Sequence, residues 1–150
     1  MGRHSSKKWD GPTIREMRAH LGLSQTQFSK KFGVPLRTIV SWEASEKESP
    51  TISSRPCPYH VYKLLNIIIY ECGGNVLDNN ASTDVIVLPF VEIRRLFHHT
   101  QASLSEYLGC SKRTIELWEA SDRMASYHHQ PASYIKPLLY WALCGHPYGE

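Results

Sequence analysis

The sequence predicts an all-α protein in which one small helical domain occurs twice in tandem. The first observation is a repeat, because "SWEAS" at 41–45 returns as "LWEAS" at 117–121. The second is helical spacing of apolar residues, such as Phe28 and Phe32, which are four positions apart and share one helix face. The third is a composition of 41% hydrophobic and 21% charged residues, which is typical of a packed domain. A chain of 150 residues has room for two small domains.

The repeat extends well beyond the shared residues Trp-Glu-Ala-Ser. A shift of 76 positions places residues 24–45 over residues 100–121, and a shift of 74 matches Leu64 with Leu138 and Leu65 with Leu139. Identical pairs at the first shift include Glu16/Glu92, Arg18/Arg94, Gln25/Gln101, Ser29/Ser105, Gly33/Gly109, Arg37/Arg113, Thr38/Thr114, Ile39/Ile115 and the Trp-Glu-Ala-Ser residues. Such self-similarity indicates a duplicated domain. We therefore predict an N-terminal domain at 1–74, a linker at 75–88 and a second, diverged domain at 89–150.

Each copy is expected to consist of four or five short helices. The first helix is expected to begin near Thr13 and to end at Gly22. Ser24, with Gln27 three residues later, predicts the capping box of a second helix. Gly33 suits the left-handed backbone of a tight turn, and Pro35 suits the first turn of a third helix.

The third helix is expected to bury Ile39 and Trp42 and to leave its opposite face free. Helix, tight glycine turn and helix form the helix-turn-helix motif, which the second copy repeats around Gly109, with Ile115 and Trp118 inward. A last helix follows in each copy, and we expect the apolar stretches 64–69 and 138–143 to lie in the core or at a dimer surface.

Charge and motif content narrow the function classes. Residues 1–75 carry eleven Lys/Arg against six Asp/Glu, a net charge of +5, whereas residues 76–150 carry six against eight, a net charge of −2. A polyanion would therefore meet the N-terminal half first. The apolar stretches are too short to span a membrane, no metal-ligand spacing or cofactor motif is found, and no nucleophile–base arrangement indicates an enzyme.

The stretch "LSQTQFSKKFGVPLRTIVSWE" resembles the helix-turn-helix of lambda-Cro-like phage and bacterial repressors, the XRE family. The resemblance is close over about 13–71 and weaker over about 89–143. It implies two lambda-repressor-like domains in a cytoplasmic, nucleoid-associated regulator of transcription, namely a phage or mobile-element repressor that controls its own gene. It also implies a homodimer on double-stranded DNA. Ser45 and Ser121 depart from the family, in which a glycine commonly follows the Trp-Glu pair.

A major groove admits one α-helix, and this predicts which residues bind DNA. Arg37 is expected to bond guanine, and Leu36 or Val40 to touch a thymine methyl. The predicted DNA-binding residues of the first copy are Gln25, Lys30, Leu36, Arg37, Thr38, Val40 and Ser41. Those of the second copy are Gln101, Lys112, Arg113, Thr114 and Leu117. The family resemblance places Gln25 and Gln101 against phosphates, while Glu43 and Glu119 are expected to brace the fold.

Two arrangements on DNA remain open. One chain could imitate a repressor dimer on an imperfect palindrome, because half-sites one turn apart are separated by about 34 Å and an extended linker could span about 40 Å. The charge difference instead favours a homodimer in which the N-terminal domains bind DNA and the second domain dimerises or binds another protein. Rival functions are a host-defence inhibitor, such as an anti-CRISPR protein, that uses its second domain to bind a protein, and an antitoxin.

Overall fold

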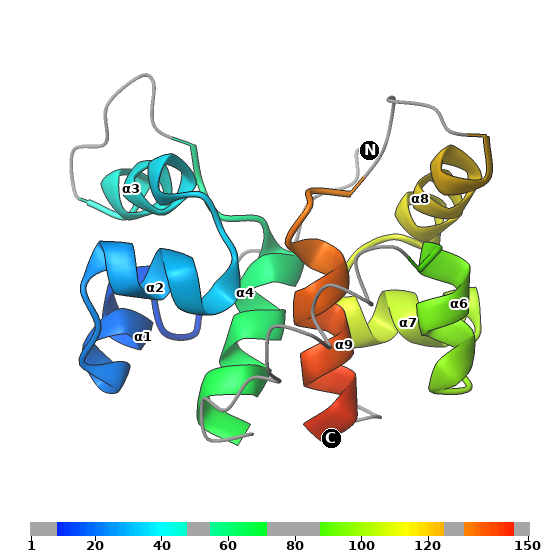
Figure 1. Ribbon diagram of the computed structural model, residues 1–150, viewed down its shortest axis with the longest axis horizontal. Coiled ribbons are helices and arrows are strands. Elements are labelled where there is room, and N and C mark those ends of the chain that lie inside the picture. Colours follow the sequence, from blue (N-terminus) through cyan, green and yellow to red (C-terminus); the bar gives the residue numbers. More distant parts are fainter. Residues whose placement is uncertain (1–8, 48–54, 72–87, 125–130, 146–150) are drawn as a thin grey trace.

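The computed structural model describes residues 9–47, 55–71, 88–124 and 131–145. Every regular element within these ranges is helical, and the prediction of an all-α fold is confirmed. Figure 1 shows the N-terminal half (residues 9–71) and the C-terminal half (residues 88–145) at opposite ends of the long axis. Helices α4 and α9, one from each half, lie side by side between them and are in contact.

The N-terminal half begins its helices where the sequence indicated. Its elements are α1 (Ile14–Leu21), α2 (Gln25–Phe32), α3 (Leu36–Ser45), α4 (Tyr59–Asn66) and the π-helical turn η1 (Ile67–Glu71) that continues α4. Thr13 and Ser24 cap α1 and α2, each through a complete capping box. These caps satisfy backbone N–H groups that have no partner inside the helix, so they fix where α1 and α2 begin.

The C-terminal half has the same helix order. Its elements are α6 (Phe90–Leu96), α7 (Gln101–Leu108), α8 (Lys112–Met124) and α9 (Ile135–Gly145). Thr100 caps α7, and Gly109 ends it with φ 74°, as Gly33 ends α2 with φ 73°. The backbone therefore turns in the same left-handed conformation at both equivalent glycines, which the sequence predicted for Gly33.

A single hydrophobic core runs through both halves. Leu64 and Leu65 of α4 and Leu138 and Leu139 of α9 are fully buried, and α9 packs against both α4 and η1. The apolar stretches 64–69 and 138–143 therefore contact each other inside one chain. Burying a leucine side chain contributes about 1.5–3 kcal/mol, so the interface between the halves is a substantial part of the core.

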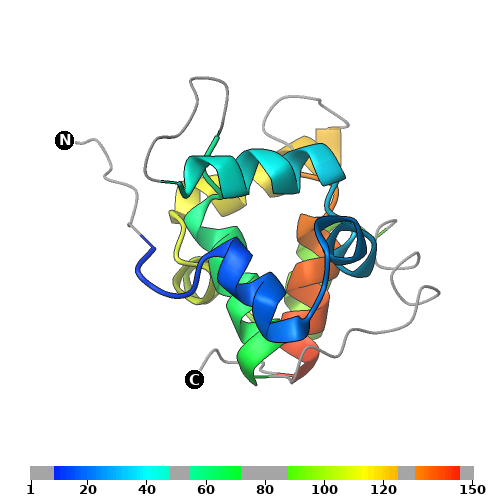
Figure 2. The ribbon, with the colours of Figure 1, turned by 90° about the vertical axis from the view of Figure 1, so that its left-hand side faces the viewer.

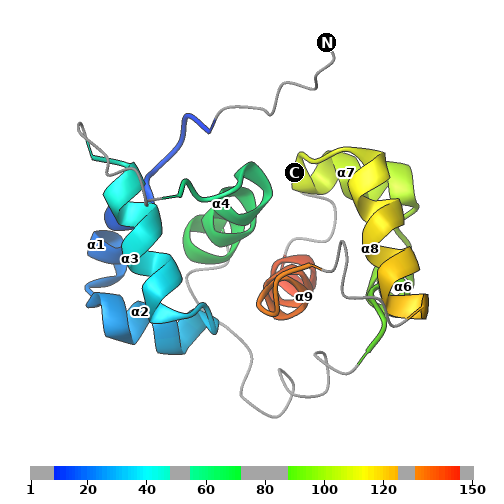
Figure 3. The same cartoon turned by 90° about the horizontal axis from the view of Figure 1, so that it is seen from above.

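Helices α3 and α8 lie on the same side of the molecule. Figure 1 shows them at the two upper ends, and the view from the end of the long axis (Figure 2) places both above α4 and α9. Seen from above, α3 and α8 flank the central pair α4 and α9 (Figure 3). The helices that follow the two glycine turns, α3 and α8, thus lie on one side of the molecule.

Some expectations lie outside the described residues. These include all but the last residue of the linker expected at 75–88. The domain boundaries at 74 and 89 stay a prediction. No helix in the described ranges is both long and apolar enough to cross a bilayer.

Candidate nucleic-acid interface

The orientation of α3 is set by the turn that precedes it. The N–H of Gly33 donates to the Ser29 carbonyl, and the Ser29 hydroxyl donates to the Val34 carbonyl at 2.6 Å. Pro35 then stands at the N-cap, with φ −56°, and α3 begins at Leu36. The two hydrogen bonds and the fixed proline φ leave the chain little freedom, so α3 leaves α2 in one defined direction.

One face of α3 is buried and the other is open. Ile39 and Trp42 are buried in the core, whereas Leu36 and Val40 are 42% and 45% exposed. These two side chains provide the apolar contacts that a thymine methyl requires.

Arg37 lies on the same open face and is exposed. Within the described part of the chain it has no ion-pair partner. Arg113, its counterpart on α8, is 74% exposed but lies 3.6 Å from the Glu116 carboxylate. The two helices therefore present different electrostatic surfaces to a polyanion, and α3 presents the more favourable one.

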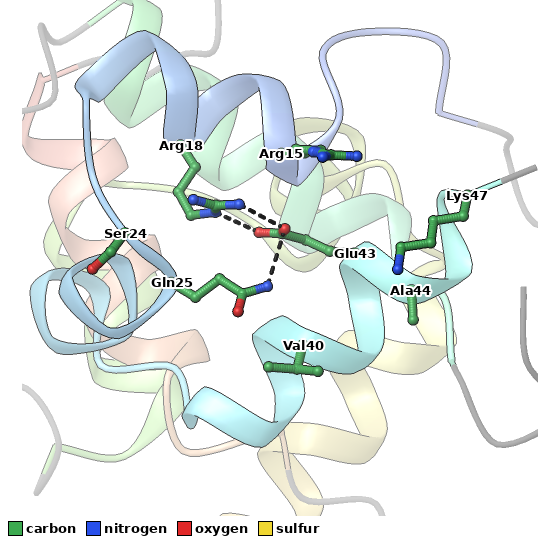
Figure 4. A pocket seen from close by; sticks show the side chains of 8 residues that line it. All are labelled: Arg15, Arg18, Ser24, Gln25, Val40, Glu43, Ala44 and Lys47. Carbon is green, nitrogen blue, oxygen red and sulfur yellow. Dashed lines mark hydrogen bonds and ion pairs between the residues drawn. The ribbon is translucent and has the colours of Figure 1, made fainter.

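A partly buried ion pair holds α1 against α3. Arg18 Nε and Nη2 donate to the two carboxylate oxygens of Glu43 at 2.7 and 2.9 Å, and Arg18 Nη1 donates to the Leu23 carbonyl. The hydrogen bond to Glu43 raises the pKa of Arg18. Figure 4 shows the pair together with Gln25, which donates from Nε2 to Glu43 Oε1 at 3.1 Å. This arrangement sets the distance of the α2 N-terminus from α3.

The same polar cluster recurs in the C-terminal half. Arg94 donates to both carboxylate oxygens of Glu119 and to the His99 carbonyl, and Gln101 Nε2 donates to Glu119 Oε1 at 3.0 Å. Each of these residues lies 76 positions after its equivalent in the N-terminal half. The expectation that Glu43 and Glu119 brace the fold is confirmed by these contacts.

Gln25 and Gln101 lie at the first positions of α2 and α7. Each uses one amide N–H for its glutamate, which leaves the second N–H of the same amide for another acceptor. The helix N-terminus nearby favours an anion such as phosphate. Their contact with phosphate stays a prediction.

A crevice of about 390 Å³ opens where α1, α2 and α3 meet. Its lining includes Arg15, Gln25, Val40 and Lys47, and Figure 4 shows Arg15 and Lys47 on the same side of it. Sequence reasoning missed Arg15 and Lys47. Arg15 could have been noticed because it lies in the first turn of α1, where the helix dipole disfavours a cation. A cation at such a position is unexpected unless it has another role.

Glu46 offsets this unfavourable placement. Its carboxylate accepts hydrogen bonds from the N–H groups of Ile14 and Arg15 and from the Tyr62 hydroxyl. The carboxylate therefore supplies the negative charge that the α1 N-terminus prefers. The Arg15 side chain itself is exposed.

A second cleft, of about 690 Å³, borders the other flank of α3. Its lining includes Arg37, Thr38 and Ser41 of α3. It also includes Arg55, which precedes α4 in the N-terminal half, and Tyr134 of the C-terminal half. Burial, with a smaller effect of the nearby Cys57, raises the pKa of Tyr134 to about 12, so its hydroxyl is uncharged at neutral pH. The cleft thus combines two cationic groups with hydroxyls on the side of α3 that faces the other half.

Arg55 is the third cation that the sequence did not indicate. Its backbone N–H donates to the Ser41 hydroxyl at 2.8 Å, and its side chain is exposed. Ser41, predicted to contact bases, therefore also anchors residue 55 to α3. Pairing a hydroxyl with an N–H fourteen positions later depends on the path of the intervening chain, which composition does not reveal.

The remaining predicted residues lie at the surface or at helix ends. Lys30 and Lys112 are exposed, and Thr38 and Leu117 are half-buried. Thr114 donates its backbone N–H to the Ser111 hydroxyl, and the two hydroxyls lie 3.0 Å apart at the start of α8. Its side chain therefore takes part in the helix cap, and its contact with DNA stays a prediction.

The described residues contain no cluster of three or more side chains able to hold a metal ion. Helix α2, the turn at Gly33 and helix α3 with its exposed cationic face define a helix-turn-helix. Residues 14–54 match the family model described as Helix-turn-helix, and this match suggests a DNA-binding regulator. Comparison with curated proteins and with solved structures gives no match.

Proposed function

We propose that this chain is a sequence-specific, double-stranded DNA-binding regulator of transcription in which α3 enters the major groove. The observation that carries the proposal is the open face of α3. It bears the guanidinium of Arg37, which has no ion-pair partner within the described residues, beside the exposed apolar side chains of Leu36 and Val40. A guanidinium bonds bidentately to guanine O6 and N7, and short apolar side chains meet the thymine methyl, so this face discriminates between base pairs.

The surroundings of α3 support contact with the DNA backbone on both flanks. Arg15 and Lys47 line the crevice on one flank, and Arg55 lines the cleft on the other. Phosphate contacts fix the register of a protein on DNA. Cations on both sides of α3 therefore favour its insertion into the major groove. The amide of Gln25, fixed by Glu43, belongs to the first of these flanks.

The tandem arrangement is part of the proposal. In it, α7, Gly109 and α8 form a second helix-turn-helix that arose with the first by duplication. The recurrence of the Arg-Glu-Gln cluster and of the left-handed glycine at a shift of 76 supports this origin.

The resemblance to phage and bacterial repressors adds a biological role. The chain would repress transcription from a phage or mobile element and would bind upstream of its own gene. Footprinting of that upstream DNA tests this role, and protection elsewhere only would contradict it. No observation in the described part of the chain favours the rival roles of defence inhibitor or antitoxin.

The direct test selects binding sites for the full chain from a pool of random duplexes and then compares variants on the selected site. Arg37→Ala should weaken specific binding by about 1–3 kcal/mol and relax the preference at one base pair. Arg95→Ala is the matched control, because it also removes one exposed guanidinium, which lies on α6 and pairs only at 3.8 Å with Glu92. Equal affinities of the two variants, or failure to select any common sequence, would contradict the proposal.

A further inference from the structure

The two halves contact each other through a reciprocal pair of aromatic contacts. Trp42 of the N-terminal half meets the Tyr134 ring of the C-terminal half edge to face, with 5.8 Å between ring centroids. Trp118 of the C-terminal half meets the His60 ring of the N-terminal half in the same way, at 5.4 Å. The tryptophans are equivalent at the shift of 76 and their partners at the shift of 74. Exchanging the halves therefore exchanges the two contacts.

Such reciprocity is the mark of a two-fold interface, in which residue i contacts j and residue j contacts i. Here both copies of the surface belong to one chain. The helices at the centre of this interface follow the same two-fold pattern. The residues that α4 and η1 bury almost completely are equivalent in the repeat to those that α9 buries. These equivalent pairs are Val61/Ile135, Leu64/Leu138, Leu65/Leu139, Ile68/Ala142 and Ile69/Leu143.

Further contacts fix the halves relative to each other. Lys63 Nζ donates to the Glu106 carbonyl at 3.2 Å, and α4 packs on α7. The ring of Tyr59 lies so close to Gly109 that a Cβ at that position would be 2.2 Å from Tyr59 Cε1. A buried apolar interface with such close contacts is expected to behave as a rigid unit rather than as two tethered domains.

The consequence is a fixed relation between α3 and α8, which lie on the same side of the molecule (Figures 1 and 3). Building on the proposed function, we infer that one chain binds one duplex at two half-sites about one helical turn apart, with α3 in one major groove and α8 in the next. The interface that would join two subunits of a homodimer is then occupied within the chain.

The two half-sites are inferred to differ in sequence. At the position of Val40 on α3, α8 has Glu116, and Leu36 is replaced by Lys112. A carboxylate accepts a hydrogen bond from cytosine N4, whereas a valine methyl meets a thymine methyl. The partner is thus an asymmetric operator that lacks the exact palindrome of a homodimer site.

The stoichiometry of the complex tests this inference. The full chain is mixed with a selected duplex of about 30 bp, nearly three helical turns, and the mass of the complex is measured by light scattering. One chain per duplex is expected. Two chains per duplex, with Arg37-dependent binding retained, would overturn the inference and leave the proposed function intact, whereas absence of sequence-selective binding would overturn both.

Half-site spacing provides a second measurement on the same complex. Inserting about five base pairs between the half-sites turns one of them by about half a helical turn, out of reach of a rigid chain. Affinity should fall about 100-fold or more, because the second contact gains its strength from being intramolecular. Arg113→Ala should remove footprint protection at one half-site and Arg37→Ala at the other. Unchanged affinity after the insertion, or loss of protection at the same half-site in both variants, would contradict the inference.

Discussion

Replacing Glu43 with glutamine is predicted to destabilise the fold strongly. The Glu43 side chain is 7% exposed and accepts two hydrogen bonds from Arg18 and one from Gln25. Glu43→Gln removes the negative charge and turns an amide N–H toward the guanidinium. Breaking a fully buried pair costs about 3–5 kcal/mol, and because Arg18 keeps 20% exposure we expect about 2–4 kcal/mol here.

The free energy of unfolding, measured by urea denaturation, checks this value. Glu92→Gln is the matched control, since Glu92 is 52% exposed, lies 3.8 Å from Arg95 and should cost less than about 1 kcal/mol. Glu119→Gln should behave like Glu43→Gln because it breaks the equivalent pair with Arg94. Losses no larger than that of the control would refute the conclusion that these pairs brace the fold.

Three further predictions concern separate parts of the molecule. Arg55→Ala should weaken DNA binding without altering thermal stability and should lower the slope of log affinity against log salt by about 1, as measured by titration at several salt concentrations. Gly33→Ala should cost about 1–2 kcal/mol through its left-handed backbone, and Gly109→Ala should cost more because Tyr59 must also move, as thermal melting will show. Burial lowers the pKa of His60 from 6.5 to about 4, so the unfolded chain binds more protons between these values. Stability should therefore fall by at most about 3 kcal/mol as the pH drops from 6.5 to 4, and less in His60→Phe; equal pH dependence in both chains would contradict this.

Local features of the fold were predictable from sequence because their causes are local. A capping serine followed three residues later by glutamine, or a glycine at the end of a helix, provides hydrogen bonds for the free backbone groups of that helix end. These hydrogen bonds do not depend on distant parts of the chain. The beginning of α2 at Gln25 and the left-handed turn at Gly33 follow from such patterns.

The relation between the halves depended on tertiary packing. The apolar stretch 64–69 suits a core or a dimer surface equally well, since both bury it, and only its contact with α9 distinguishes them. The contact of Gln25 with Glu43 likewise needs the α2–α3 crossing. A clue was present, because Arg18, Gln25 and Glu43 all recur at the shift of 76, and polar residues retained together are typical of one hydrogen-bonded cluster.

The central claim is that the open face of α3 occupies a major groove. Methylation interference on a selected duplex tests it most directly, because dimethyl sulfate modifies guanine N7 in the major groove and adenine N3 in the minor groove. We expect guanine methylation within the half-site of Arg37 to block binding of the full chain, and this block to be lost in Arg37→Ala. Interference at adenines alone, or a guanine pattern that is the same in both chains, would contradict the claim.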